Sequence, residues 1–319
     1  MNGNKVIVQY GVEETYGTVG TATKQIEIAS ESFKLNLNKK EEGLLTGKAV
    51  GGRVRTVSKS IDGGFKTLVR PDDIGLFLAA ALGEEASVTV VPSSTAAYKH
   101  DFTITDEDVL PSLFFKVKRD STVVKSYSGL AVDSINFDSS AEDYLNVDIT
   151  FVGKDEEDDD LETGLSNSPL DTLRFAGTTL TVGGTALEVS STKFSYSNNH
   201  DAKTQTNLTG LYFKQPEVGQ RDITVELEAI YDSVSNGVRD SYWLTDSDVA
   251  VSIKFVSREE VEEGYPYSLT FTLPLCQVTE ATVNISGKDR VKLPLKLKLV
   301  DDTGFKVSLV NGLATKYIV

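Results

Sequence analysis

Two distant stretches of this chain carry the same order of alternating apolar and polar residues. Gln25–Asn38 reads QIEIASESFKLNLN, and Ala186–Asn199 reads ALEVSSTKFSYSNN. Four further matches follow in the same order at nearly constant spacing: Leu45–Gly47 with Leu208–Gly210, Ile61–Val69 with Ile223–Tyr231, Leu113–Val117 with Leu269–Leu273, and Ile135–Phe151 with Val283–Leu299. Self-similarity at a fixed period indicates a repeated structural unit. The sequence therefore predicts a duplicated domain, which can fill two equivalent positions of a symmetric assembly.

The length of 319 residues suits two domains that each bury a core. We expect the first domain at residues 1–154, an acidic linker at 155–175, and the second domain with a C-terminal strand or arm at 176–319. No apolar run approaches the ~20 residues that span a bilayer, so no membrane partner is expected. The single Cys276 excludes an internal disulfide.

Alternation with a period of two residues dominates the chain and predicts an all-β fold, mainly antiparallel sandwiches or barrel-forming sheets. We expect two short helices, one per domain. The first is Arg70–Gly83, where Pro71 suits the first turn, Gly83 suits the C-cap and one face is apolar. The second and weaker pattern lies at Val234–Leu244.

A long loop interrupts the strands of each half, at Lys39–Arg53 and at His200–Gln220. Loops beyond about 12 residues are usually functional or disordered. Apolar side chains on such loops indicate that another surface covers them, with folding back onto their own domain as the alternative. The candidate assembly residues are Gly43, Leu44, Leu45, Thr46, Val50, Leu208, Thr209, Leu211, Tyr212 and Phe213.

The charge of the chain argues against a specific nucleic-acid site. The net charge is −15, which repels phosphate. The acidic run Asp155–Asp160 lacks the glycine-centred spacing of a calcium loop, so we interpret it as a solvated linker. His100 and His200 have no metal ligands at a suitable spacing, and no nucleotide-binding or nucleophile motif is present. We expect no cofactor, no metal and no enzyme activity, although the many acids leave a two-carboxylate hydrolase open.

Several phrases of the first half resemble the tail tube proteins of long-tailed, siphovirus-like bacteriophages: EETYGTVGT at Glu13–Thr21, SESFKL at Ser30–Leu35, KSIDGGF at Lys59–Phe65 and RPDDIGLFLAAALG at Arg70–Gly83. The resemblance implies a β-sandwich flanked by a helix. It also implies that six such domains form a ring, and that stacked rings form a tube for genome ejection. It gives the inter-ring contact to the loop Lys39–Arg53 and, through the repeat, to His200–Gln220.

The resemblance further implies an acidic lumen through which DNA passes without specific binding. Asp133, Asp148 and Glu226 are the candidate lumen acids, because they alternate with apolar neighbours on predicted strands. A duplicated domain would reach six positions with three chains, a pseudo-hexameric trimer. A hexamer with one half outside the ring is the alternative. The implied partners are other copies of the chain, the tape measure, the terminator and the baseplate, within the virion. The open alternatives are a terminator or baseplate hub of the same fold, and a carbohydrate-binding adhesin.

Overall fold

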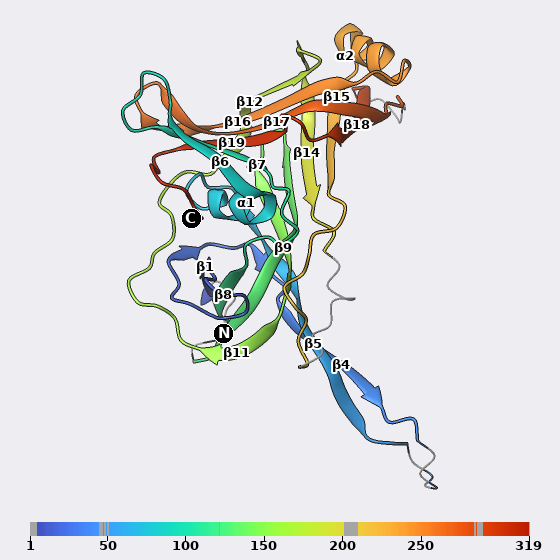
Figure 1. Ribbon diagram of the computed structural model, residues 1–319. Coiled ribbons are helices and arrows are strands. Elements are labelled where there is room, and N and C mark those ends of the chain that lie inside the picture. Colours follow the sequence, from blue (N-terminus) through green and yellow to red (C-terminus); the bar gives the residue numbers. More distant parts are fainter. Residues whose placement is uncertain are drawn as a thin grey trace.

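The computed structural model describes residues 5–318 except 45, 46, 48, 50, 121, 201–209, 284 and 286–289. In this part of the chain nineteen strands form antiparallel pairs, joined by two short α-helices and one π-helical turn (Figure 1). The expected all-β fold is confirmed. None of the described helices is long and apolar enough to span a bilayer.

The first half of the chain contains eleven strands and the first helix. They are β1 (Ile7–Val12), β2 (Lys24–Ile26), β3 (Ser30–Glu31), β4 (Lys34–Glu41), β5 (Val54–Leu68), α1 (Ile74–Leu82), β6 (Gly83–Val90), β7 (Tyr98–Ile104), β8 (Leu113–Lys118), β9 (Val124–Ser140), β10 (Asn146–Gly153) and β11 (Asp155–Asp159).

The second half contains eight strands and the remaining helical elements. They are β12 (Arg174–Val182), β13 (Thr185–Ala186), β14 (Val189–Ser197), β15 (Asp222–Ile230), α2 (Ser233–Val238), η2 (Arg239–Trp243), β16 (Val249–Glu262), β17 (Tyr265–Glu280), β18 (Lys292–Asp301) and β19 (Lys306–Asn311).

The long strand β9 belongs to two sheets. Its N-terminal part pairs with β8 and β11, and its C-terminal part pairs with β10 and β14. Gly129 lies where the partners change, and its φ of 66° is in the left-handed region that favours glycine. A side chain there would also meet Lys154 and Tyr16. The strand can therefore leave one sheet and enter the other without a break.

Strand pairing follows the same order in the two halves. β1–β8–β9 corresponds to β12–β16–β17, and β4–β5–β10–β9 corresponds to β14–β15–β18–β17. β9 pairs with β10 and then β11 along one edge, as β17 pairs with β18 and then β19. A helix follows β5 in the first half and β15 in the second. These correspondences support the duplication inferred from the sequence, which stays a proposal.

Two of the sequence matches align strands that do not correspond in this pairing. Leu113–Val117 lies in β8 and Leu269–Leu273 in β17, although the counterpart of β17 is β9. Ile135–Phe137 lies within β9, whereas Val283 and Ile285 follow the end of β17. Alternating apolar residues fit any half-buried strand, so the pattern alone could not distinguish neighbouring strands.

The halves are joined through their sheets. β9 pairs with β14 over seven residues, and β19 pairs with β7 of the first half. One run of eight strands, β4–β5–β10–β9–β14–β15–β18–β17, therefore crosses from the first half to the second. Phe137 of the first half packs against Phe194 and Phe271 of the second, with ring centroids 6.2 Å and 5.1 Å away.

Helix α1 differs from the expectation of one apolar stripe, because all nine of its residues are buried. It lies under the β6–β7 hairpin and against β9 (Figure 1). Gly83 ends it in the left-handed conformation, and its N–H donates to the Ala79 carbonyl, as expected of a C-cap glycine. The weaker helix is also present, as α2 and η2, and Asp232 and Ser235 form a capping box at its start.

The acidic run differs from the interpretation as a solvated linker. Asp155–Asp159 forms β11 at the edge of β9. Lys116 forms ion pairs with Asp159 and Glu162, and Lys125 forms one with Asp158. Neutralisation by lysines on neighbouring strands allows this acidic segment to lie in a sheet.

Candidate functional site

The hairpin β4–β5 projects from the body of the molecule as an arm (Figure 1). Its strands pair over Lys34–Glu41 and Val54–Asp62, and a register shift lies at Asn38 and Lys39. Beyond the body, no second layer formed by the described residues covers the hairpin, and its outer residues in that set are mostly exposed. A projecting hairpin of this kind is stable only as an extension of a larger sheet, which β10 supplies along β5.

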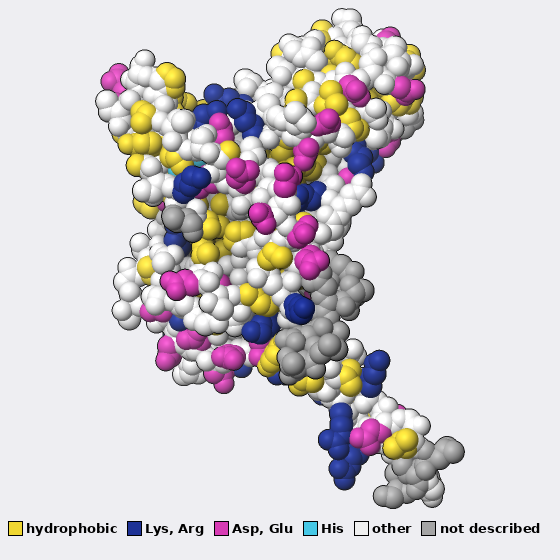
Figure 2. Space-filling view, in the orientation of Figure 1, with side chains coloured by type: hydrophobic (Ala, Val, Ile, Leu, Met, Phe, Trp, Pro, Cys, Tyr) yellow, Lys and Arg dark blue, Asp and Glu magenta, His cyan; other side chains and the backbone are white. Residues whose placement is uncertain are grey.

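Apolar side chains lie exposed along the arm. Leu44 is 73% exposed near the tip, and Val54 is 60% exposed on the returning strand. Arg55 and Glu42 form an ion pair of 2.8 Å across the hairpin beside them. Figure 2 shows basic side chains gathered along the same arm. Exposed apolar groups on a projecting element indicate a contact surface.

Of the arm residues expected to take part in assembly, the structure describes Gly43 and Leu44. Both are exposed. Leu45, Thr46 and Val50 lie outside the described residues. An inter-ring role for the arm stays a prediction.

The second loop follows a different course from the first. The Leu211 carbonyl accepts a hydrogen bond from the Lys59 N–H, and the Lys59 ammonium lies 5.2 Å from the centre of the Tyr212 ring. Gln215 then donates to the Leu110 carbonyl at 2.8 Å. These contacts hold residues 211–217 against the first half of the same chain.

The structure therefore separates the two sets of candidate assembly residues. Leu211 is 41% exposed, whereas Tyr212 and Phe213 are half-buried. Leu208 and Thr209 lie outside the described residues. Tyr212 packs on Lys59 of the first half rather than on its own half, and an inter-ring role for these residues stays a prediction.

One side of the eight-strand run carries polar side chains, and we call it the polar face. Register places these residues in rows across the strands. One row is Lys66, Asp148, Asn136, Ser195, Thr224 and Lys298, and the next is Asp138, Lys193, Glu226, Lys296 and Glu280. The other side carries the alternate, apolar residues of the core.

Opposite charges alternate along the polar face. Lys66 pairs with Asp148 at 2.9 Å, and Lys296 pairs with Glu280 at 3.1 Å. The hydrogen bond that the Lys66 ammonium donates to Asp148 raises the pKa of Lys66, and the one that Lys296 donates to Glu280 raises the pKa of Lys296. A face of paired charges offers neither a continuous basic track for phosphates nor a uniformly acidic wall.

Two of the three candidate lumen acids lie on this face. Asp148 and Glu226 occupy adjacent rows on β10 and β15. Asp133 lies at the bulge of β9, where it accepts from the His200 N–H at 3.0 Å. Burial acts to raise the pKa of Asp133, but the hydrogen bond and the charge of His200 outweigh it and hold the pKa below its usual range. Their placement in a lumen stays a prediction.

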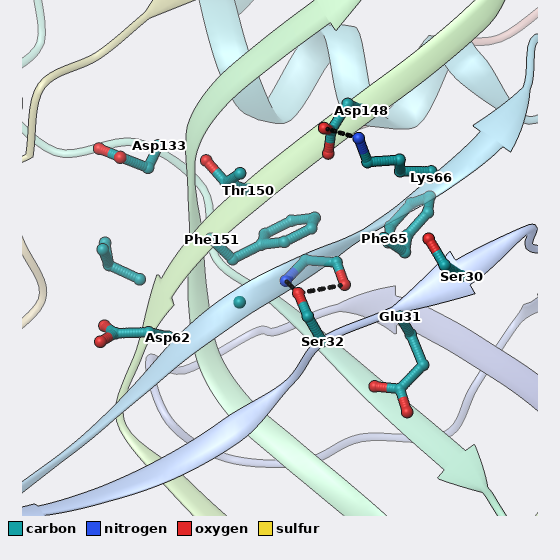
Figure 3. Close-up of a pocket in the computed structure, with 13 residues that line it drawn as sticks. Ser30, Glu31, Ser32, Asp62, Phe65, Lys66, Asp133, Asp148, Thr150 and Phe151 are labelled. Carbon is teal, nitrogen blue, oxygen red and sulfur yellow. Dashed lines mark hydrogen bonds and ion pairs between the residues drawn. The ribbon is translucent and has the colours of Figure 1, made fainter.

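Asp133 and Asp148 also line an open pocket of about 340 Å³ on the same side (Figure 3). Lys66 points to Asp148 across its rim, and Asp62 lies at the other end. Its floor is backbone of Gly63 and Gly64, where an added Cβ would clash with the Ser32 and Ile149 carbonyls. Within the described residues no group of three or more acids, histidines or cysteines could hold a metal ion.

His100 has a structural environment. Its side chain is fully buried, with Nδ1 2.6 Å from Glu85 Oε1 and Nε2 3.0 Å from Asn311 Oδ1. Glu85 also accepts from the Tyr317 N–H at 2.8 Å. The cluster ties the segment after β19 to the β6–β7 hairpin, which the sequence pattern did not predict.

Sequence reasoning also missed an arginine at the outer edge of β3 and β4. Arg119 forms an ion pair with Glu31 at 2.5 Å and donates to the Phe33 carbonyl at 3.0 Å. The SESFKL phrase is the one sequence signal at this edge, and it does not predict a contact with Arg119.

Comparison with known proteins identifies the family. The model of the phage tail tube protein family matches residues 3–298. No curated protein matches the chain.

Proposed function

The chain belongs to the phage tail tube protein family, and from this we propose that three copies form each ring of a tube through which the genome leaves the particle. Membership makes the chain a structural component of the virion rather than an enzyme. Ring formation, the number of copies and passage of DNA are our proposal.

The observation that carries the proposal is the run of eight strands. Four of them, β4, β5, β10 and β9, belong to the first half, and the corresponding four belong to the second. A sheet that closes on itself across subunits has no exposed edges. If each half fills one of six positions, three chains close the ring. The β9–β14 junction inside each chain then forms every second contact between neighbouring positions.

The polar face suits the inside of such a tube. Alternate residues of each strand send ionic and hydroxyl groups to this side and apolar groups to the core. DNA meets paired charges there, so few lysines are free to hold phosphates and displace counterions. Low affinity for the cargo is what a conduit requires.

The arm suits the contact between rings. It extends from β5, one of the strands of the eight-strand run, and exposes Leu44 and Val54 beyond the body of the molecule. Burial of these side chains against the next ring would contribute about 25 cal/mol for each Å² of apolar area.

Electron microscopy of the purified protein, combined with the mass of a single ring, tests the proposal. We expect rings or tubes without any cofactor and three copies in each ring. Six copies would contradict the trimer and favour the hexamer in which one half lies outside. A chain that stays monomeric at high concentration, and on every initiator of assembly, would contradict tube formation. Low abundance in purified virions would favour a terminator or hub.

A further inference from the structure

The eight-strand run has an open edge at each end. At one end, the described residues of β3 and β4 pair only with β5. At the other, β16 pairs with β17 as far as Cys276, and the residues Gln277–Glu280 that follow pair only with β18. These edges lie at opposite ends of the run, so one edge of a chain can meet the other only in a second copy.

The junction inside the chain provides a template for that meeting. There β14 pairs with the C-terminal part of β9, with Tyr196 opposite Ile135 and Ser195 opposite Asn136. β14 corresponds to β4, and β9 corresponds to β17. The free edge of β4 should therefore pair with the free end of β17 as β14 pairs with β9.

Hairpin registers align the first strand of this pair. Lys34 lies opposite Asp62, and Ser195 lies opposite Thr224. Phe33 and Phe194, one residue earlier, both enter the core and stack on an aromatic ring of the long strand, Tyr127 or Phe271. Lys34 is thus the counterpart of Ser195, and Leu35 that of Tyr196.

The second strand is aligned in the same way. Ile149 of β10 lies opposite Phe65 of β5 and Ile135 of β9. In the second half, Leu295 of β18 lies opposite Leu227 of β15, the counterpart of Phe65, so Leu295 is the counterpart of Ile149. Because Lys296 lies opposite Glu280, Leu295 falls opposite Ala281. Ala281 is fully buried, as Ile135 is. It is therefore the counterpart of Ile135.

We propose that Phe33–Asn36 of one copy pairs antiparallel with Glu280–Val283 of a second copy, with Leu35 opposite Ala281 and Lys34 opposite Thr282. The pairing rests on the proposed function, since it is the contact that closes the ring, and it specifies the residues and the register of that contact.

Arginine side chains cover both edges in the single chain. Ser32 N–H donates to the Gly64 carbonyl of β5, so the backbone groups of the next residue, Phe33, face the open edge. Phe33 N–H donates to Glu31 at 3.1 Å, and its carbonyl accepts from Arg119 at 3.0 Å. On the other edge the Ala281 carbonyl accepts from Arg239 at 3.1 Å.

These contacts satisfy backbone groups that the second copy would otherwise pair. An open strand edge pairs readily with any other chain, and charged side chains that cover it limit such pairing. Arg119 and Arg239 therefore protect the two edges of the free chain and give way when the edges meet.

Disulfide cross-linking tests the register. One preparation carries Lys34→Cys and another carries Thr282→Cys, both at exposed positions. Residues directly opposite each other in an antiparallel pair lie within disulfide range. Cys276 is retained, because it is fully buried and burial raises the pKa of its thiol to about 12. The matched control is a chain with Asn136→Cys and Ser195→Cys, the equivalent pair at the internal junction.

We expect a linked dimer only when the two preparations are mixed under assembly conditions, and an internal disulfide in the control. Rings without the cross-link would overturn the pairing and leave the proposed function in place. Cross-linking of Lys34→Cys to Gln277→Cys instead would overturn the register. A protein that never assembles would overturn the proposed function and this pairing with it.

Arg119→Ala tests the protective cover. If Arg119 competes with the second copy, the variant should form the same cross-link at a protein concentration roughly tenfold lower, the effect of about one charged hydrogen bond. Circular dichroism confirms that the variant is folded. If the variant needs the same or a higher protein concentration to form the cross-link, Arg119 does not protect the edge.

Discussion

Phe194 stacks on Phe271 with ring centroids 4.4 Å apart and an interplanar angle of 29°. Phe33 and Tyr127 form the matching pair of the first half, at 5.2 Å and 23°. Phe194 lies in β14 and Phe33 directly precedes β4, the counterpart of β14, while their partners lie in the long strands β17 and β9. Both pairs connect the eight-strand run to the opposing layer of the core.

Replacement of Phe194 by alanine should lower the free energy of unfolding by about 3–5 kcal/mol, because Phe194 is buried and the cavity would remain open. Urea denaturation followed by tryptophan fluorescence measures the change. Phe33→Ala should cost a similar amount if the two halves are built alike. A loss below about 1 kcal/mol for Phe194→Ala would mean that the core relaxes around the gap.

Asn198 joins the two halves by hydrogen bonds. Its fully buried side chain donates to the carbonyls of Ala81, in α1, and Val132, in β9, at 2.9 Å and 2.8 Å. Asn198→Asp removes both donors and faces the carbonyls with a carboxylate, so we expect a loss of about 3 kcal/mol. Thermal unfolding compares it with Asn199→Asp at the exposed neighbouring position. Equal melting temperatures for the two variants would contradict this role.

Leu44→Asp should weaken the stacking of rings without changing the fold. Leu44 is 73% exposed, so its replacement should alter the free energy of unfolding by less than about 0.5 kcal/mol. Tube length in electron micrographs measures stacking. Leu244→Asp, at an apolar position 58% exposed on the opposite part of the molecule, is the control. Normal tubes from the Leu44 variant would exclude this residue from the contact.

Asp73 should make stability depend on pH between about 4 and 6. Burial, reinforced by repulsion from Asp72, raises the pKa of Asp73 to about 6. A raised pKa means that the folded state favours the protonated carboxyl. Its contribution to stability is therefore complete below the unfolded pKa near 4 and is lost as the pH rises through 6.

Asp73→Asn removes this titration and keeps an acceptor for the Tyr10 hydroxyl, which lies 3.5 Å from Asp73. Between pH 4 and pH 7, the free energy of unfolding of the variant should rise by about 2 kcal/mol relative to that of the wild type. Urea titrations at both pH values give the difference. Asp302→Asn, at an exposed position, is the control. Parallel pH profiles for wild type and Asp73→Asn would contradict the raised pKa.

Glu226→Lys should slow the passage of DNA. Glu226 lies opposite Lys193 on one side and Lys296 on the other, so the substitution creates three adjacent lysines on the polar face. Free lysines bind phosphates by releasing counterions, and added salt weakens this binding. Ejection rates from particles that carry the variant should fall at low salt and recover at high salt. Asp302→Lys makes the same charge change away from the polar face, and an equal effect there would exclude a local cause.

Most of the strand content and the two helices could be anticipated from local patterns, whereas the projecting hairpin β4–β5 was expected only as a long loop at Lys39–Arg53. Alternation in Ile61–Leu68 or Asp222–Ile230 reflects one buried and one polar side, which a chain shows wherever its strands pair. The end of α1 followed from Gly83, which restricts the backbone locally, whereas the helix begins at Ile74, three residues after the Pro71 expected in its first turn. The β6–β7 hairpin and β11 were missed, because Glu85 and Asp155 are acids that only distant partners make compatible with burial.

The sequence by itself determined the all-β class and the positions of most strands and both helices, because alternation and turn residues act on neighbours along the chain. The tertiary structure decided which strands pair. It joined β9 to β14, tied the strand β19 to β7, and placed Arg119 and Arg239 over the two open edges. These contacts connect residues far apart in the chain, so they depend on the closure of the whole sheet rather than on any local pattern.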